Sequence, residues 1–180
     1  MARLQLLYIH GFGSRVDPQG DKQVSLRKIA DVRAFATDYA QPYAQILQEV
    51  TPLLKDVDLF IGTSMGGFLV SRLSELTGKP FVAINPVMSP LPTLSKYLGT
   101  HQDYYGRTYT MTPAITASYP DFLASDKGLV LLDMEDELID SRATQRLLAP
   151  QMSVHTFEGG NHRFAHMEEA LALITAHADR

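Results

Sequence analysis

Cysteine is absent from this chain of 180 residues. Its absence excludes disulfide bonds, thiolate nucleophiles and cysteine-based zinc sites together, and it fits a reducing compartment. No apolar run approaches the roughly 20 residues that a membrane-spanning helix needs. Met1 to Arg3 lead directly into a strand-like run, without the shape of a signal peptide. We therefore expect a cytoplasmic protein that does not bind a membrane.

Basic clusters, internal repeats and low-complexity tracts are also missing. The formal net charge is -4, so we expect neither nucleic acid nor an anionic membrane surface as a partner. The composition, with 45% hydrophobic and 20% charged residues, is that of an ordinary globular protein. Its length predicts a single domain over residues 1–180, large enough to bury a core.

The most informative motif has the form G-x-S-x-G, with Ser64 at its centre between Gly62 and Gly66. A strand-like apolar run precedes it at 57–61, and residues 64–76 follow with helical spacing. A strand, a serine between glycines and a helix predict a nucleophile elbow. Side chains at the two glycine positions would collide across so sharp a turn. The alternative is an ordinary strand-to-helix turn that is rich in small residues.

Strand-like and helix-like patterns alternate along most of the chain. We predict strands at 4–9, 32–37, 57–61, 81–84, 129–132 and 151–157. We predict helices at 21–30, 43–54, 64–76, 140–148 and 164–177. This alternation predicts βαβ crossovers, and hence an α/β fold with a mainly parallel sheet of about six strands flanked by helices.

Residues 87–127 break this alternation. They are rich in proline and tyrosine, and neither a clear strand nor a long helix fits them. Long loops in compact domains are usually functional or disordered, and the aromatic content argues against disorder. We predict a small lid or cap insertion over the site, with short helices near 94–98 and 113–119.

Three side chains with complementary chemistry each follow a predicted strand. Ser64 follows the third strand, Asp136 the fifth and His162 the sixth. Reacting groups gather at the carboxyl ends of the strands in open α/β sheets. A serine hydroxyl needs a base, and the base needs a third group that holds its tautomer. The order Ser, Asp, His is that of the α/β-hydrolases.

His162 is the preferred base because Gly159 and Gly160 allow a turn that aims the next side chain over the sheet. The other histidines have weaker positions: His155 lies in a strand, His166 and His177 lie in the last helix where we expect them to be solvated, and His101 lies in the predicted lid.

The acid is less sharply specified. Asp136 lies in the middle of the turn after the fifth strand, and we favour it. Asp133 is nearer the strand end and orients the loop in this interpretation, whereas Asp140 caps the next helix. Either remains an alternative for the acid.

An oxyanion hole needs two backbone N–H groups. We expect one from Met65, directly after the nucleophile, and the other from Phe12 in the loop after the first strand. His10, at the start of that loop, is expected to be a structural histidine that braces it.

Five motifs keep their order over nearly the whole chain: Tyr8-Ile9-His10-Gly11-Phe12-Gly13-Ser14, Gly62-Thr63-Ser64-Met65-Gly66-Gly67, Ile84-Asn85-Pro86, Asp136-Glu137-Leu138-Ile139-Asp140 and Glu158-Gly159-Gly160-Asn161-His162. Together they resemble the YqiA/YcfP group of small α/β-hydrolase-like esterases. The resemblance implies a reduced α/β-hydrolase fold and carboxylester hydrolysis, with the triad carried onto Ser64, Asp136 and His162. The chain departs from the group at Glu135, where a glycine is expected, and in a longer first loop that holds residues 17–20.

The sequence thus predicts a serine hydrolase (a carboxylesterase) that cleaves a small-molecule acyl ester without a cofactor or metal. Met88, Leu91 and the tyrosines of 87–127 suggest a pocket for a modest apolar acyl or aryl group. An acyl thioesterase and a non-catalytic binding module on a hydrolase scaffold are the alternatives.

Overall fold

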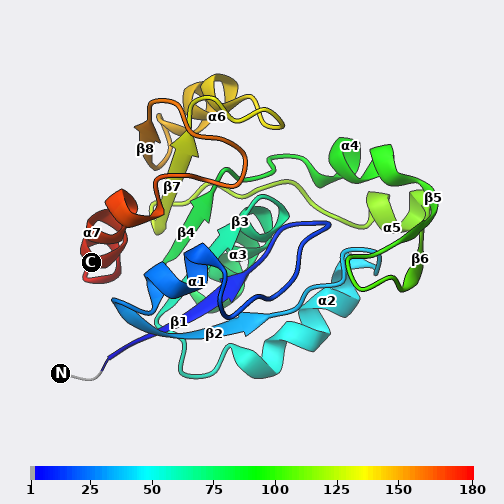
Figure 1. Ribbon diagram of the computed structural model, residues 1–180, viewed down its shortest axis with the longest axis horizontal. Coiled ribbons are helices and arrows are strands. Elements are labelled where there is room, and N and C mark those ends of the chain that lie inside the picture. Colours follow the sequence, from blue (N-terminus) through cyan, green and yellow to red (C-terminus); the bar gives the residue numbers. More distant parts are fainter. Residues whose placement is uncertain (1–2) are drawn as a thin grey trace.

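Six parallel strands form the central sheet of the computed structural model, which describes residues 3–180 (Figure 1). The expectation about the chain's first residues therefore lies partly outside the described residues. The spatial order is β2-β1-β3-β4-β7-β8. The strands are β1 (Leu4–Ile9), β2 (Ala30–Phe35), β3 (Leu59–Thr63), β4 (Phe81–Ile84), β7 (Gly128–Asp133) and β8 (Ser153–Phe157).

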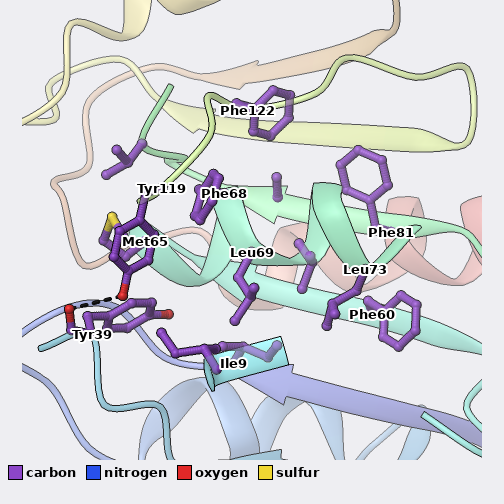
Figure 2. Close-up of a cluster of buried hydrophobic side chains, with 14 of the residues drawn as sticks. Ile9, Tyr39, Phe60, Met65, Phe68, Leu69, Leu73, Phe81, Tyr119 and Phe122 are labelled. Atoms are coloured by element: carbon purple, nitrogen blue, oxygen red, sulfur yellow. Dashed lines mark hydrogen bonds between the residues drawn. The ribbon is translucent and has the colours of Figure 1, made fainter. Parts of the chain in front are cut away.

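The central strands are apolar throughout because helices cover both faces of the sheet. Neighbouring residues of β1 point to opposite faces, so Leu6 packs into one hydrophobic cluster and Leu7 into the other. Figure 2 shows the first cluster, in which Ile9 and Phe60 of the strands pack with Phe68 of the helix that follows β3. Strands buried on both faces in this way are typical of parallel α/β sheets.

The helices of the sheet region are α1 (Asp21–Leu26), α2 (Tyr43–Val50), the 3-10 helix η1 (Thr51–Leu53), α3 (Met65–Thr77), α6 (Ser141–Leu148) and α7 (Met167–Ala178). The clusters place α2, α3 and α6 on one face, and α1 and α7 on the other. Within residues 3–180, no helix is both long and apolar enough to cross a membrane.

The 87–127 segment runs from β4 to β7 and has its own small elements. They are α4 (Pro90–Leu94), the 3-10 helix η2 (Ser95–Tyr97), β5 (Gly99–Gln102), β6 (Thr108–Met111) and α5 (Pro113–Ala117). Tyr119 anchors the segment, because its ring is buried and its hydroxyl donates to the carbonyl of Tyr39 at 3.0 Å (Figure 2) and to that of Gln41 at 2.8 Å.

The predicted α/β fold with a parallel sheet of about six strands is confirmed. The prediction of no strand within 87–127 is wrong, since β5 and β6 form an antiparallel hairpin. Several boundaries also differ: the second strand begins at Ala30 instead of 32, the helix predicted at 21–30 ends at Leu26, and the last helix begins at Met167 instead of 164.

Candidate active site

Ser64 lies at the turn between β3 and α3 in a strained backbone conformation. Its φ and ψ are 58° and -118°, and positive φ is uncommon for a residue with a side chain. Three backbone hydrogen bonds hold the residue there. Its N–H donates to Ile84 O at 2.9 Å, and its carbonyl accepts from Val87 and Phe68 at 3.1 and 3.2 Å. The end of β4 therefore fixes the turn that presents the serine.

Glycine is required on both sides of Ser64 because the backbone is crowded. A Cβ at position 62 would overlap the carbonyl oxygen of Gly66, across the turn as predicted. A Cβ at position 66 would overlap the carbonyl oxygen of Ile9 instead, at the end of the neighbouring strand. The second glycine thus allows α3 to start close against β1.

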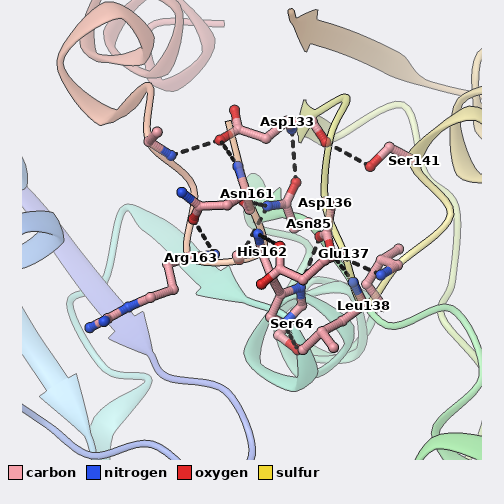
Figure 3. A network of polar contacts seen from close by, with 12 residues as sticks. Ser64, Asn85, Asp133, Asp136, Glu137, Leu138, Ser141, Asn161, His162 and Arg163 are labelled. Carbon is pink, nitrogen blue, oxygen red and sulfur yellow. Dashed lines mark hydrogen bonds and ion pairs between the residues drawn. The ribbon is translucent and has the colours of Figure 1, made fainter. Parts of the chain in front are cut away.

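The structure brings Ser64, His162 and Asp136 into one hydrogen-bonded chain (Figure 3). His162 Nε2 lies 3.0 Å from Ser64 Oγ, and His162 Nδ1 lies 2.8 and 3.0 Å from the two oxygens of Asp136. An ionised carboxylate only accepts hydrogen bonds, so Nδ1 of the imidazole carries the proton and Nε2 is free to accept one from the serine. The Asp136 side chain is fully buried.

Loop amides orient the Asp136 carboxylate from the opposite direction. The N–H groups of Leu138 and Ile139 both donate to Oδ1 at 2.8 Å. The loop after β7 therefore fixes the orientation of a buried carboxylate that contacts the imidazole.

The backbone of His162 is itself held on both sides. Its N–H donates to Glu137 Oε2 at 2.9 Å, and its carbonyl accepts from Asn85 Nδ2 at 3.2 Å. The bond from the His162 amide lowers the pKa of Glu137. Asn85 is fully buried; it also donates to Asn161 O at 3.1 Å and accepts from Asp133 N–H at 2.9 Å. The Asn-Pro pair after the fourth strand was visible in the sequence, but this clamp was not predicted.

Asp133, the first alternative acid, makes no hydrogen bond or ion pair with His162 and holds the loop instead. Its buried carboxylate accepts from the N–H groups of Asn161 and Ala165 at 3.1 and 2.7 Å. It also lies 2.7 Å from Nδ1 of His166. The expectation that His166 is a solvated helix residue is therefore wrong, because it precedes α7 and its ring pairs with a buried acid.

The second alternative, Asp140, caps α6 by accepting from Ala143 N–H at 2.9 Å. Among the other histidines, His155 and His101 are exposed. His177 was expected to be solvated, but it is buried and its Nε2 donates to Lys127 O at 3.0 Å. Within residues 3–180, no three His, Asp or Glu side chains are grouped so that they could hold a metal ion.

The loop after β1 lies directly against the serine. A Cβ on Gly11 would be 3.1 Å from Ser64 Cβ. His10 braces this loop as predicted: Nδ1 donates to Gly11 O at 2.7 Å, and Nε2 accepts from Thr37 N–H at 3.1 Å. Burial lowers the pKa of His10, with an opposing effect of the bond to Gly11, so the ring is neutral and structural.

Phe12 and Met65 occupy positions suited to an oxyanion hole. The Phe12 N–H donates no hydrogen bond to another residue within 3–180, and Met65 is the first residue of α3, where N–H groups have no partner inside the helix. The Phe12 ring packs against Tyr97 and Tyr109 of the 87–127 segment, with ring centroids 4.7 and 6.2 Å apart. A cavity of about 650 Å³ lies along this aromatic contact.

Residues 5–179 match the model of the uncharacterised protein family UPF0227. The chain belongs to the UPF0227 family. This confirms the resemblance to the YqiA/YcfP group. A UPF0227 protein of Yersinia enterocolitica is 28% identical over 185 residues, which cover 95% of this chain and 97% of that protein. A UPF0227 protein of Yersinia pseudotuberculosis is 27% identical over 183 residues, with the same coverage.

Solved structures place this UPF0227 protein among the α/β-hydrolase folds. Est1E from Butyrivibrio proteoclasticus superposes with a TM-score of 0.71 at 14% identity, covering 99% of this chain and 90% of that one. Mouse alpha/beta hydrolase domain-containing protein 10 gives 0.69 at 16% identity, with 97% and 89% covered. A monoacylglycerol lipase from Paleococcus ferrophilus gives 0.68 at 13% identity, with 97% and 94% covered. At these identities the likeness defines the fold.

Proposed function

We propose that this UPF0227 protein is a serine hydrolase that cleaves small carboxylic esters through an acyl-enzyme. The observation that carries the proposal is the chain of hydrogen bonds from Asp136 through His162 to Ser64. A histidine that accepts at Nε2 and donates at Nδ1 to a buried carboxylate is arranged to act as a general base. The names of two proteins that share the fold, a monoacylglycerol lipase and an esterase domain, agree with ester cleavage.

In the proposed mechanism, Ser64 Oγ attacks the ester carbonyl carbon while His162 Nε2 takes the hydroxyl proton. Asp136 accepts from Nδ1 and stabilises the imidazolium. When the tetrahedral intermediate collapses, the bond to the alcohol oxygen breaks and His162 passes the proton to that oxygen. In the second half of the reaction, His162 takes a proton from a water molecule, whose oxygen attacks the acyl carbon. The bond from that carbon to Ser64 Oγ then breaks, His162 passes the proton to Oγ, and the carboxylic acid is released.

We assign the oxyanion hole to the backbone N–H groups of Phe12 and Met65. Both belong to segments that lie against Ser64, and the start of α3 adds the positive end of its helix dipole. Loss of one oxyanion donor typically costs about 10²–10³-fold in rate. We also propose that residues 87–127 act as a lid, since their aromatic rings pack against Phe12.

The test is a panel of short-chain esters and matched thioesters, assayed with the wild type and with Ser64→Ala. We expect ester hydrolysis by the wild type and a loss of about 10⁴-fold or more in the variant, since removal of a triad nucleophile leaves only residual catalysis. Higher kcat/KM on the thioesters would assign the protein to the thioesterases. No turnover of any member by folded wild-type protein would overturn the proposal.

A further inference from the structure

A second cavity, of about 680 Å³, lies on the other side of the loop after β1. Ser14 and Tyr104 line both cavities, so the two are neighbours. The walls of the second one come from α1, from α7 and from the two loops that precede these helices. Those loops are also the ones that carry Phe12 and His162. The cavity therefore adjoins two of the proposed reacting groups without being part of the triad.

Two cations line this cavity. Lys22 of α1 and Arg163, the residue after His162, make no ion pair or side-chain hydrogen bond within residues 3–180. Figure 3 shows the Arg163 side chain extending away from the triad, on the side of the N-terminal strands and helix. Lys22 is only partly exposed. Burial, followed by the charge of Arg163, lowers the pKa of its ammonium group, and the charges of Asp21 and Asp133 oppose this shift only in part. Two like charges brought together in a partly desolvated space are stabilised by an anion between them.

The acidic residues of the cavity do not supply that anion. Glu168 is paired with Lys28 at 2.8 Å and accepts from Ser25. Asp17 accepts from Gln19 N–H at 3.0 Å and lies 3.8 Å from Arg15. The remaining carboxylate, Asp21, is the neighbour of Lys22 in sequence but lies beyond ion-pair distance from it.

The proposed reaction indicates which part of a substrate would reach the second cavity. In the proposed reaction His162 passes a proton to the leaving oxygen, so the alcohol departs beside His162. Asn161 and Arg163 flank His162 in the chain and line the cavity. A tail on the alcohol would therefore run from His162 toward the two cations.

We propose that Lys22 and Arg163 form an anion subsite, which selects esters whose alcohol part carries a carboxylate or phosphate group. This inference rests on the proposed esterase function for the placement of the alcohol, but the binding of an anion at the subsite can be measured without turnover. Charge-assisted hydrogen bonds to such a group are stronger than neutral ones.

The substrates for the test are acetyl esters of ω-hydroxy acids with two to six methylene groups. Each is compared with two acetyl esters of the same chain length. One carries a primary amide in place of the acid, with similar size and no charge, and the other carries a phosphate. We expect kcat/KM for the best acid or phosphate to exceed that for the amide by about tenfold or more at low salt. The preference should shrink as ionic strength rises. In Lys22→Gln and Arg163→Gln the ratio should fall toward one, whereas Lys55→Gln, a substitution on the loop before β3, should retain it.

The binding arm uses the free ω-hydroxy acids, phosphates and amides with Ser64→Ala protein, measured by calorimetry. Tighter binding of the anions that disappears in Lys22→Gln supports the subsite, whether or not the protein hydrolyses esters. Preference for the phosphate over the acid, or the reverse, identifies the anion. If the acetyl esters with a terminal amide are hydrolysed, and the acids and phosphates show neither a higher kcat/KM nor tighter binding, the subsite is overturned and the esterase function stays intact. Anion binding without any ester turnover would support the subsite and overturn the esterase function.

Discussion

The glycine pair before His162 allows the structure to be tested by two almost identical substitutions. Gly159 and Gly160 have φ of 74° and 77°, so an alanine at either position loses about 1–2 kcal/mol through its left-handed conformation. Their surroundings differ. A Cβ at 159 meets nothing within 4 Å, whereas a Cβ at 160 would overlap Oδ2 of Asp133.

Relief of that overlap requires the Asp133 carboxylate to move. It is fully buried, and it holds the amides of Asn161 and Ala165 and the ring of His166. Hydrogen bonds to a charged group contribute about 1.5–3 kcal/mol each. Loss of one or two adds about 2–5 kcal/mol to the effect of the backbone. We therefore expect Gly160→Ala to lower the free energy of unfolding by about 3–7 kcal/mol and Gly159→Ala by about 1–2 kcal/mol.

Urea unfolding followed by circular dichroism measures the two values, and ester turnover at a temperature where both variants are folded measures the effect on the site. Gly160→Ala should also lower kcat, because the same loop positions His162. Equal destabilisation of the two variants, within about 0.5 kcal/mol, would show that the Asp133 carboxylate does not obstruct a side chain at position 160.

Three other predictions concern the groups around the proposed triad. Asn85→Ala leaves the carbonyls of Asn161 and His162 and one buried amide without partners, so we expect a loss of about 3–5 kcal/mol in urea unfolding together with a lower kcat at similar KM; unchanged stability would contradict the clamp. Asp136→Asn should lower kcat by about 10²–10⁴-fold with little loss of stability, whereas Asp133→Asn should mainly lower stability; the reverse pattern would make Asp133 the acid. The pKa of His177 is lowered, chiefly by burial, so below about pH 6.5 the unfolded chain takes up a proton before the folded one and stability falls as the pH drops. We expect His177→Gln to reduce the slope of the unfolding free energy against pH between about pH 6.5 and 5. An identical slope in the variant would show that His177 does not cause this loss of stability.

The sequence predicted the sheet well because its central strands are buried on both faces. Such strands read as uninterrupted apolar runs, and β4 matches its predicted range residue for residue. The β5–β6 hairpin escaped prediction for the opposite reason. Its strands are short, largely exposed and rich in threonine, and Asp103 shapes the turn by accepting from Tyr105 and Arg107 amides. Neither the exposed strands nor the side-chain hydrogen bonds of the turn produce an alternation of apolar and polar residues that could be recognised in the sequence.

Helix ends were predicted less accurately because tertiary hydrogen bonds set them. The residues before α7 look helical in composition, but Ala165 N–H and the His166 ring bond to Asp133 instead. The start of α7 is therefore decided by a carboxylate from β7. The burial of His177 has the same kind of origin, since its partner is a carbonyl on a segment 50 residues away in the chain.

The candidate site was predictable in its order but not in its geometry. Motif order placed Ser64, Asp136 and His162 after their strands, and topology brought those strand ends together. Three aspartates within eight residues could not be ranked from spacing alone. What distinguishes them is which amides each one meets: Asp136 meets those of its own loop, whereas Asp133 meets those of the loop that carries His162.

Covalent labelling with a fluorophosphonate probe reports whether Ser64 is an activated nucleophile, because the probe reacts with a serine only when a base activates it. Intact mass spectrometry of folded protein should show one adduct, and peptide mapping should place it on Ser64. Ser64→Ala should remain unlabelled, and His162→Ala should react far more slowly. Absence of an adduct on folded wild-type protein, or an adduct that persists in Ser64→Ala, would contradict the account.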